Sequence, residues 1–384
     1  AFDPAGTVTR AEMAKMITIM LNGGKEPVLS TNATPAYSDI GGHWAQKYIE
    51  YCSKNGIIAG QGDGTFNPNG TVTGSQAAKM ALVALGYDSN VFNFTGIDWE
   101  VNVNSTANAP ECDLYDDLSG LNPSEGLSRD NAAQLLYNAL DARVMDRNYD
   151  SVASSGEVTY KYSLSNVTMM EKKFDAVKVE GVVVANEVAD LASTADKGNS
   201  LDANRTRISV TNYGTGNGEQ DDFKTSLTVQ AATGLEDLGR SVNVYVKKNS
   251  SASKAEVLGS VIVSADNTVV TDYSADSISK VADDNSLKIV SGTMTAANYG
   301  GSTTLTNANA TKAGIRGVEK VLIDNDDDGN VDYVLLNTYA FGKVTSYVTS
   351  GDGSITVTAG QAMTASDKDD VVGFDDVKKD DYVL

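Results

Sequence analysis

The sequence predicts an α+β multidomain protein, with a helical N-terminal part followed by all-β sandwich or small-barrel modules. Apolar residues recur at helical spacing as far as residue 146, which is the pattern of amphipathic helices. From residue 157 onward, short runs rich in Val and Thr alternate with clusters of Gly, Asn and Asp, as is typical of strands and turns. A polar stretch from Arg147 to Gly156 separates the two parts, and we expect a linker there.

The composition excludes several classes of function. The chain has 384 residues, enough for two or three domains, and its net charge of −21 would repel nucleic acids and anionic membrane surfaces. It has one histidine, His43, so histidine triads and multi-histidine metal sites are ruled out. Two cysteines, Cys52 and Cys112, are too few for a disulfide framework or a four-thiolate zinc site. A single bridge between them and two buried free thiols remain alternatives.

One pattern occurs three times in the helical part, over residues 4–21, 68–85 and 123–140. Each copy has a proline five residues before a hydroxyl residue, and an apolar stripe at helical spacing follows. A hydroxyl residue with Glu or Gln three positions later is a capping box, so a helix is predicted to begin at each hydroxyl. The hydroxyl residues and their partners are Thr9 with Glu12, Thr73 with Gln76, and Ser128 with Asn131, the last an approximation to the box.

These copies define three helical units of unequal completeness. A partial unit covers residues 1–22, a second unit covers 37–87, and a divergent third covers 92–146. The second unit has an additional helix from Ala45 to Cys52, which Gly56 ends as a left-handed cap. The first unit lacks this helix, so we expect the native polypeptide to extend upstream of Ala1.

The β part is predicted to hold one or more modules over residues 157–340 and the start of a further module over residues 341–384, cut off at Leu384. The basis is a loose internal repeat, in which three segments recur in the same order. The alternative is that strands beginning with Gly and Val look alike in any β protein. The segments that correspond begin at Gly181 and Gly342, at Arg207 and Ser354, and at Gly234 and Gly373.

An Asp-rich segment in the β part is a candidate calcium loop, because Ca²⁺ binds clusters of hard oxygen ligands around a sharp glycine turn. Position 12 of this loop is Leu335, where an EF-hand has a bidentate Glu, and strands are predicted on both sides instead of helices. A solvated hairpin turn is the competing interpretation, since Asp and Gly are common turn residues. The predicted ligands are Asp324, Asp326, Asp328, Asn330 and Asp332, with Gly329 at the turn.

Four motifs of the helical part recur in a fixed order: residues 2–12, which include Thr-Arg-Ala-Glu; His43-Trp44-Ala45; residues 56–60; and Asp63 to Pro68. Together they resemble the S-layer homology (SLH) domain. The resemblance implies that three units form a pseudo-threefold bundle. It also implies an extracellular protein, held non-covalently on a secondary cell-wall polysaccharide of a Gram-positive-type envelope, commonly through pyruvylated sugars.

Arg10 and Arg129 are the expected ligand contacts of the SLH units. The capping box leaves the second position free, so an arginine there is expected to be exposed at a helix N-terminus whose free N–H groups favour an anion. The arginine fork can bind the carboxylate of a pyruvyl group through two parallel hydrogen bonds. The alternative is a pair of solvated surface arginines. The second unit has Gly74 at this position, so its groove is expected to be weak or empty.

Three further residues are candidate contacts with sugar. Trp44 and Trp99 each stand at a helix start, where the ring either covers a sugar or anchors the core. Asp39 precedes the Trp44 helix and is either its N-terminal cap, which we favour, or a polar sugar contact. His43 is expected to be a structural hydrogen-bonding residue.

The sequence shows no nucleophile motif, phosphate loop or paired catalytic carboxylates, so we expect no enzymatic activity in this chain. The first hypothesis is a structural surface protein, whose β modules assemble into an S-layer or related array. The second is an SLH-anchored exoenzyme with an active domain outside residues 1–384, and the third is an adhesin. All three place the protein at the cell wall.

Overall fold

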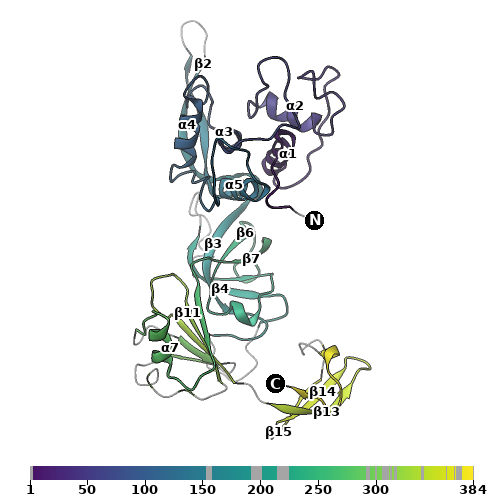
Figure 1. Ribbon diagram of the computed structural model, residues 1–384, viewed down its shortest axis with the longest axis vertical. Coiled ribbons are helices and arrows are strands. Elements are labelled where there is room, and N and C mark those ends of the chain that lie inside the picture. The colour runs from purple at the N-terminus through teal and green to yellow at the C-terminus, as the bar shows by residue number, and fades with distance from the viewer. Residues whose placement is uncertain are drawn as a thin grey trace. The chain divides into compact units, whose positions relative to one another are not determined.

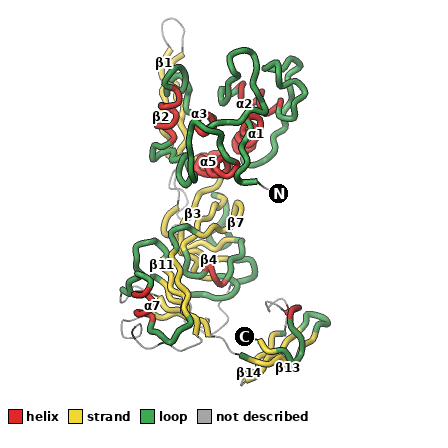
Figure 2. Tube along the Cα trace, in the orientation of Figure 1, coloured by secondary structure: helices red, strands yellow, loops and turns green. Residues whose placement is uncertain are grey.

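The structure is a computed structural model of the chain (Figure 1). It describes residues 3–152, 158–191, 201–213, 225–290, 295–298, 301–304, 311, 314, 318–338, 341–359, 361–366, 368 and 374–383. The chain divides into two compact units: residues 1–180 with 210–229 and 244–260, and residues 181–209 with 230–243 and 261–384. Helices dominate the chain up to Asp141 and strands dominate it thereafter (Figure 2), which confirms the α+β class.

Three helices begin where the repeated pattern places them. Thr9, Thr73 and Ser128 each accept a hydrogen bond from the backbone N–H three residues later, at 3.2, 3.3 and 3.1 Å. In the first two helices, the backbone N–H of the cap residue also donates to the side chain of the third helical residue. Both predicted capping boxes are therefore confirmed. The helices of this part are α1 (Arg10–Leu21), α2 (Gln46–Lys54), α3 (Gly74–Ala84), α4 (Trp99–Ala107) and α5 (Arg129–Asp141).

The apolar stripes of these helices meet in one core. Ile17 of α1, Ala81 of α3 and Leu135 of α5 are fully buried in the same cluster. Cys52 and Cys112 lie in this cluster as free thiols, so they do not form a bridge. Burial of the apolar stripes is what holds the helices together, because helices this short are marginal by themselves in water.

The three loops that precede α1, α3 and α5 are joined by a ring of backbone hydrogen bonds. Val8 donates to Leu127, Leu127 donates to Val72, and Val72 donates back to Val8, at 3.0, 2.9 and 3.0 Å. All three side chains are buried. Each repeat therefore both gives and receives one bond, and this ring links units that are about 60 residues apart in the sequence.

The predicted linker is wrong where it can be compared, because β1 (Arg143–Val152) and β2 (Val158–Thr168) form an antiparallel pair. Residues 153–156 of the prediction lie outside the described residues. The polar sequence of this segment led to the wrong prediction. The outer part of the hairpin is exposed, so its sequence lacks the alternation of apolar and polar residues that marks a half-buried strand. Helix α6 (Met169–Phe174) follows, and Met169 is buried in the helical core. The helical unit thus draws on residues beyond position 146.

The described residues of the β part form three further sheets and a short helix, α7 (Ile278–Asp284). The strand orders are β5-β4-β3-β6-β7, then β10-β9-β12-β11-β8, and β15-β14-β13-β16. Pairs are antiparallel in the second and third sheets except for β9 with β12, which is parallel. Strand bounds are β3 (Ala176–Ala185), β4 (Thr206–Tyr213), β5 (Ser226–Val229), β6 (Ser241–Lys247), β7 (Val257–Val263), β8 (Thr268–Asp272), β9 (Thr295–Asn298), β10 (Gly301–Thr304), β11 (Val318–Asp324), β12 (Tyr333–Thr338), β13 (Gly342–Val348), β14 (Ser354–Ala359), β15 (Gln361–Ala365) and β16 (Tyr382–Val383).

Backbone hydrogen bonds join β5 to the segment that leads into β7. Thr228 donates to Ala252 at 2.7 Å, and Ala255 donates to Thr228 at 2.8 Å. The two end strands of the order β5-β4-β3-β6-β7 are therefore brought toward one another. These bonds cover part of the outer edge of β5, which would otherwise carry unpaired backbone groups.

The first and third of these sheets share one strand order. β15-β14-β13-β16 corresponds to β5-β4-β3-β6, and a 3₁₀ turn precedes both β6 and β16, η2 (Leu235–Asp237) and η4 (Phe374–Asp376). The recurring glycines have a physical reason. A Cβ at Gly181 would lie 2.3 Å from the Ser209 carbonyl, and one at Gly342 would lie 2.5 Å from the Val357 side chain, so neighbouring strands approach too closely for any other residue.

Candidate functional site

A cavity of about 340 Å³ opens in the helical part, between the loop after α2, helix α3 and the start of α4. Two cationic side chains and one large aromatic ring line it, and its remaining walls are mainly apolar. The residues that matter for its chemistry are Arg10, Lys79 and Trp99, with Ile58, Met80 and Phe94 in the walls.

Arg10 reaches this cavity from the first turn of α1. Its Nε donates to the Phe66 carbonyl at 3.0 Å and its Nη2 to the Ala59 carbonyl at 2.8 Å, while the guanidinium carbon lies 4.4 Å from the centroid of the Phe66 ring. Burial lowers the pKa of Arg10 from its ordinary value, although the guanidinium remains charged at neutral pH. Arg10 is thus half-buried and held, contrary to the exposed position expected. Among the described residues none accepts a hydrogen bond from Nη1, so that nitrogen can reach a ligand.

The expected free N–H groups at the helix N-termini are absent, and this part of the prediction is wrong. The first two backbone N–H groups of each repeat helix donate to carbonyls in the proline loop of another repeat. The helix dipole is still present, but these N–H groups are no longer available to an anion. Anion binding at Arg10 must therefore come from the side chain. The bonds run from Arg10 to Gly70 and Ala11 to Pro68 in α1, from Gly74 to Glu125 and Ser75 to Pro123 in α3, and from Arg129 to Gly6 and Asp130 to Pro4 in α5.

Lys79 is a second cation in the cavity that the sequence analysis missed. Its Nζ donates to the Phe94 carbonyl at 2.6 Å and lies 5.4 Å from the centroid of the Trp99 ring. Burial lowers the pKa of Lys79 from its ordinary value. A signal was present, because Lys79 follows its cap Thr73 by six residues just as Lys15 follows Thr9.

The two tryptophans differ in exposure. Trp99 is half-buried, packs against the helical core and also lines the cavity. Trp44 is 54% exposed, which is too much for a core anchor. Its ring lies 6.0 Å from Nζ of Lys15, as Trp99 lies beside Lys79, but it lines no part of the cavity.

Asp39 is not the cap of α2, and this interpretation is corrected. The cap position is Ala45, which makes no side-chain bond. Instead the Asp39 carboxylate accepts hydrogen bonds from the backbone N–H groups of Phe66 and Asn67, at 2.8 and 2.7 Å. Burial opposes ionisation, but these two bonds outweigh it and lower the pKa of Asp39. Asp39 therefore fixes the loop whose carbonyls hold Arg10.

We predict that Asp39→Asn lowers the thermal stability of the helical part. A lowered folded-state pKa means that the stabilisation is present above the unfolded pKa, about 3.9, and is lost as the pH falls through the folded pKa. Melting curves of both proteins between pH 3 and 7 should thus converge at the acidic end. The matched control is Asp98→Asn, at the start of α4, where the carboxylate makes no cap bond. A pH-independent difference would contradict this role of the Asp39 charge.

Arg129 lies outside the cavity and is paired with a carboxylate. Its Nη1 lies 3.1 Å from Oε1 of Glu12, and its side chain is 41% exposed. Glu12 is already engaged in the capping box of α1, where its Oε2 accepts from the Thr9 backbone at 2.8 Å. The structure thus joins Arg129 to the first repeat and does not place it beside Arg10.

The position of Gly74 in the second repeat is closed. A Cβ on Gly74 would lie 2.9 Å from Cα of Pro123, so a larger side chain needs the backbone to move. The adjacent space holds a polar network, in which Ser75 and Ser124 both donate to Glu100, at 2.9 and 3.0 Å. A carboxylate there disfavours an anionic ligand, in keeping with the weak groove expected.

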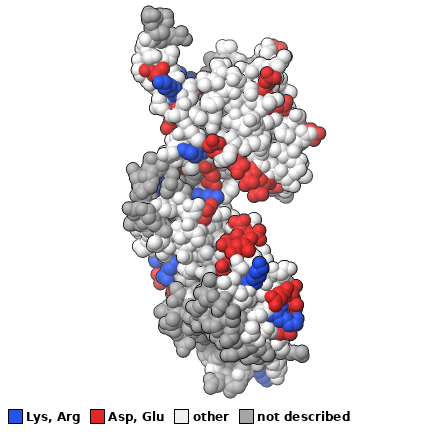
Figure 3. Space-filling view, turned by 90° about the vertical axis from the view of Figure 1, so that its left-hand side faces the viewer, with Lys and Arg blue, Asp and Glu red and all other residues white. Residues whose placement is uncertain are grey.

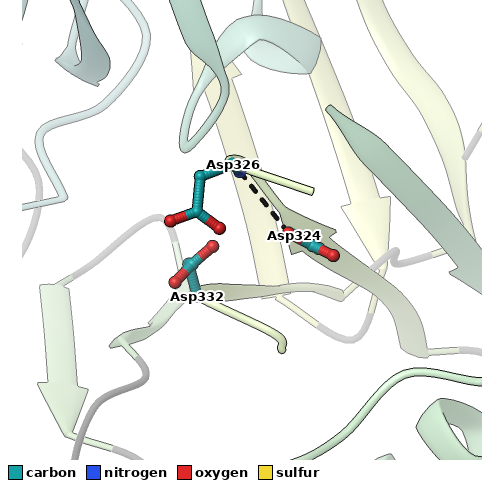
Figure 4. Close-up of side chains that lie close together, drawn as sticks. All are labelled: Asp324, Asp326 and Asp332. Carbon is teal, nitrogen blue, oxygen red and sulfur yellow. Dashed lines mark hydrogen bonds between the residues drawn. The ribbon is translucent and has the colours of Figure 1, made fainter. Parts of the chain in front are cut away.

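The Asp-rich loop lies between β11 and β12, far from the cavity in sequence. One oxygen from each of Asp324, Asp326 and Asp332 lies within 4.8 Å of the others, and Figure 4 shows the carboxylates of Asp326 and Asp332 turned toward one another. Asp328 is not part of this group, because its carboxylate accepts two bonds from Asn330, at 2.7 and 2.6 Å. Three of the five predicted ligands are therefore brought together.

Electrostatic repulsion is present within this loop. Asp324 is only 1% exposed, and its carboxylate accepts from the Gly329 backbone at 2.9 Å. Burial raises the pKa of Asp332, and the neighbouring carboxylates of Asp326 and Asp324 raise it further, against one hydrogen bond from Asn325. Oxygen ligands of this kind suit Ca²⁺, although the loop lacks a bidentate twelfth ligand.

Comparison with known proteins gives the family of the helical part. Residues 36–78 match the S-layer homology domain model. Similar proteins include a cellulosome-anchoring protein of Acetivibrio thermocellus (37% identical over 82 residues, 21% of this chain and 18% of that protein). The S-layer protein sap of Bacillus anthracis is 33% identical over 90 residues (23% and 10%), and an uncharacterized cell wall amidase of the same organism is 30% identical over 90 residues (23% and 16%).

The chain carries an S-layer homology domain, and with its relatives this places it at the cell surface. The resemblance seen in the sequence is thereby confirmed. This chain spans no more than 18% of the length of these three relatives. In the described part of the chain, no helix combines the length and the apolar character that crossing a bilayer requires.

Proposed function

We propose that this chain is a structural surface protein, anchored non-covalently by its SLH units to a pyruvylated secondary cell-wall polysaccharide. Its β modules would assemble into an S-layer or related array. The observation that carries the anchoring is the cavity with Arg10, Lys79 and Trp99 on its walls. An anchoring role is also supported by the relative that is named a cellulosome-anchoring protein.

The cavity suits an anionic sugar for three reasons. Nζ of Lys79 and Nη1 of Arg10 supply positive charge, and a partly desolvated site strengthens charged hydrogen bonds. Trp99 offers an aromatic face to the apolar face of a sugar ring. The apolar walls of Ile58 and Met80 can receive a methyl group such as that of a pyruvyl ketal.

We propose in addition that the three units form a pseudo-threefold bundle. Support comes from the ring of bonds through Val8, Val72 and Leu127, and from the equivalent bonds at the start of α1, α3 and α5. In such a bundle the Arg129 site is the counterpart of the Arg10 site, with Trp44 and Lys15 in the places of Trp99 and Lys79. Arg129, Trp44 and Asp39 therefore stay candidate contacts.

Sedimentation of the full chain with purified cell-wall sacculi tests the anchoring. We expect the protein to sediment with sacculi that carry their secondary polysaccharide and to remain in solution with sacculi stripped of it. Polysaccharide that has lost its pyruvyl groups should compete poorly. Equal binding to stripped sacculi would contradict the proposal.

Calcium binding at Asp324, Asp326 and Asp332 is also proposed, supported by the proximity of the three carboxylates. We expect a dissociation constant of about 10⁻⁴ to 10⁻³ M, as in extracellular modules that lack strong ligands. At ten times this concentration, Ca²⁺ should stabilise the loop's module by about 1.4 kcal/mol, measured by calorimetric melting against EDTA.

The calcium test needs a charge-matched control, because any divalent cation stabilises a protein of net charge −21 to some extent. Asp326→Asn should abolish the shift. Asp327→Asn removes the same charge from the same loop but lies outside the three-carboxylate group, so it should retain the shift. A shift that survives equally in both variants would rule out this site.

The alternative is an SLH-anchored exoenzyme or adhesin, whose active domain lies outside residues 1–384. The relative named as a cell wall amidase shows that proteins given an enzymatic name can share this similarity. We favour the structural function because the β sheets repeat one strand order, as expected of modules that build a surface layer.

A further inference from the structure

The outer part of the β1–β2 hairpin has no packing partner among the described residues. From Arg147 outward both strands are largely exposed on both faces, and the strands pair only with each other. An isolated two-stranded ribbon is marginally stable in water, and its two edges carry unpaired backbone groups. Such a ribbon is stabilised when another surface covers it.

One face of this ribbon is apolar and aromatic. Tyr149 lies opposite Tyr160, and Val152 lies opposite Val158, so these four side chains share a face. Tyr149 is 64% exposed and Tyr160 is 42% exposed. The guanidinium of Arg147 lies 3.6 Å from the centroid of the Tyr160 ring. We call Arg147, Tyr149, Val152, Val158 and Tyr160 the outer face.

The outer face continues a face that is packed at its base. Tyr162 lies opposite Arg147 in the register, and its ring meets Phe92 edge-on at 6.2 Å, while its hydroxyl donates to Asp88 at 3.0 Å. Met145, two residues before Arg147, packs against the helical core. The same face of the hairpin is therefore packed against the helical part at its base and exposed farther out.

The charge of the ribbon differs from that of the chain. The whole chain carries −21, so most surfaces of two copies repel each other. Figure 3 shows acidic side chains in several clusters on the face it draws. Over residues 143–168 of the sequence, the three basic side chains of Arg143, Arg147 and Lys161 are balanced by the three acidic ones of Asp146, Asp150 and Glu157, and Arg147 is the one charged residue of the outer face.

We propose that the outer face docks onto an acidic surface of a second copy of this chain. Tyrosine and arginine are among the residues enriched in protein interfaces, and Arg147, the one charged residue of the outer face, complements an acidic partner surface. Val152 and Val158 favour a protein surface over a hydrated polysaccharide. A ribbon that inserts into a different surface of the next copy makes a head-to-tail contact, which propagates into an open array. This inference rests on the array assembly proposed above and names its interface.

Sedimentation velocity of the full chain over a range of concentrations tests the interface. The parent should self-associate, and Tyr149→Ser/Tyr160→Ser should raise the dissociation constant by at least about tenfold, as expected for removing central aromatic contacts. Arg147→Glu should weaken association as well, with an effect that shrinks at high salt. The matched control is Tyr382→Ser, an exposed tyrosine outside the hairpin, which should associate like the parent.

Two readouts separate this proposal from the anchoring. Both hairpin variants should keep the parent melting temperature and should still sediment with sacculi. A parent that stays monomeric, or tyrosine variants that associate normally, would overturn the interface while leaving anchoring untouched. If the variants instead lose sacculus binding and keep self-association, the outer face contacts the polysaccharide and the proposal is wrong.

Discussion

Arg10→Ala should lose polysaccharide binding by about 10-fold to 150-fold, because one charged hydrogen-bonding partner is typically worth about 1.5–3 kcal/mol. The same change should also lower thermal stability, since the carbonyls of Ala59 and Phe66 lose the donors that hold their loop. Lys79→Met keeps an apolar stem of similar length and removes the charge, so its affinity should fall with less effect on the loop. Isothermal titration calorimetry with solubilised polysaccharide measures both affinities.

Lys15→Met is the matched control for Lys79→Met. Lys15 occupies the same position in α1 and also lies beside a tryptophan, but outside the cavity. It should therefore bind nearly as well as the parent. Equal losses in both lysine variants would show that general positive charge on the helices matters, and not this cavity; normal binding by Arg10→Ala would refute the assignment of the site.

Phe66→Ala should be the most destabilising of these changes, by about 3–5 kcal/mol. The Phe66 ring is fully buried, lies under the Arg10 guanidinium and meets the Tyr37 ring at 5.5 Å. Its removal leaves a cavity beneath Arg10, whereas the bond from the backbone N–H of residue 66 to Asp39 is retained. Calorimetric melting of the full chain should show the loss in the transition of the helical part.

The control for Phe66→Ala is Phe341→Ala. Phe341 is 66% exposed and lies at the start of the third β sheet, where truncation opens no cavity. It should leave the transition of the helical part unchanged. A Phe66→Ala protein that melts like this control would mean that the loop is held by its hydrogen bonds alone.

The helix starts could be predicted because their cause is local. A capping box needs only Thr9 and Glu12, three residues apart, and the same spacing recurs at Thr73 and Gln76. The cavity could not be predicted in this way. It forms where Arg10 from one repeat meets carbonyls about 50 residues later, and no local spacing encodes that meeting.

The predicted cap at Asp39 and the predicted linker at residues 147–152 were wrong for the same reason. Polar residues occur in caps, in loops and on exposed strands, so their type alone does not decide between these structures. Asp39 has the type and place of a cap, yet its carboxylate bonds to a loop 27 residues away. Residues 147–152 read as a linker because an exposed ribbon has no buried face to impose alternation. For Asp39 the deciding partner is distant in sequence, and for the hairpin no buried face exists, so periodicity reports neither.

The ring of bonds through Val8, Val72 and Leu127 leaves the helical part without an end repeat that could open first. In a linear stack of repeats the end units have one neighbour each, and they open first. Here every repeat is bonded to both others, so losing one breaks two of the three bonds at once. A force that pulls on the helical part would thus meet a closed ring of bonds, in which opening one repeat breaks its contacts with both others, and resistance to force comes from this circular order.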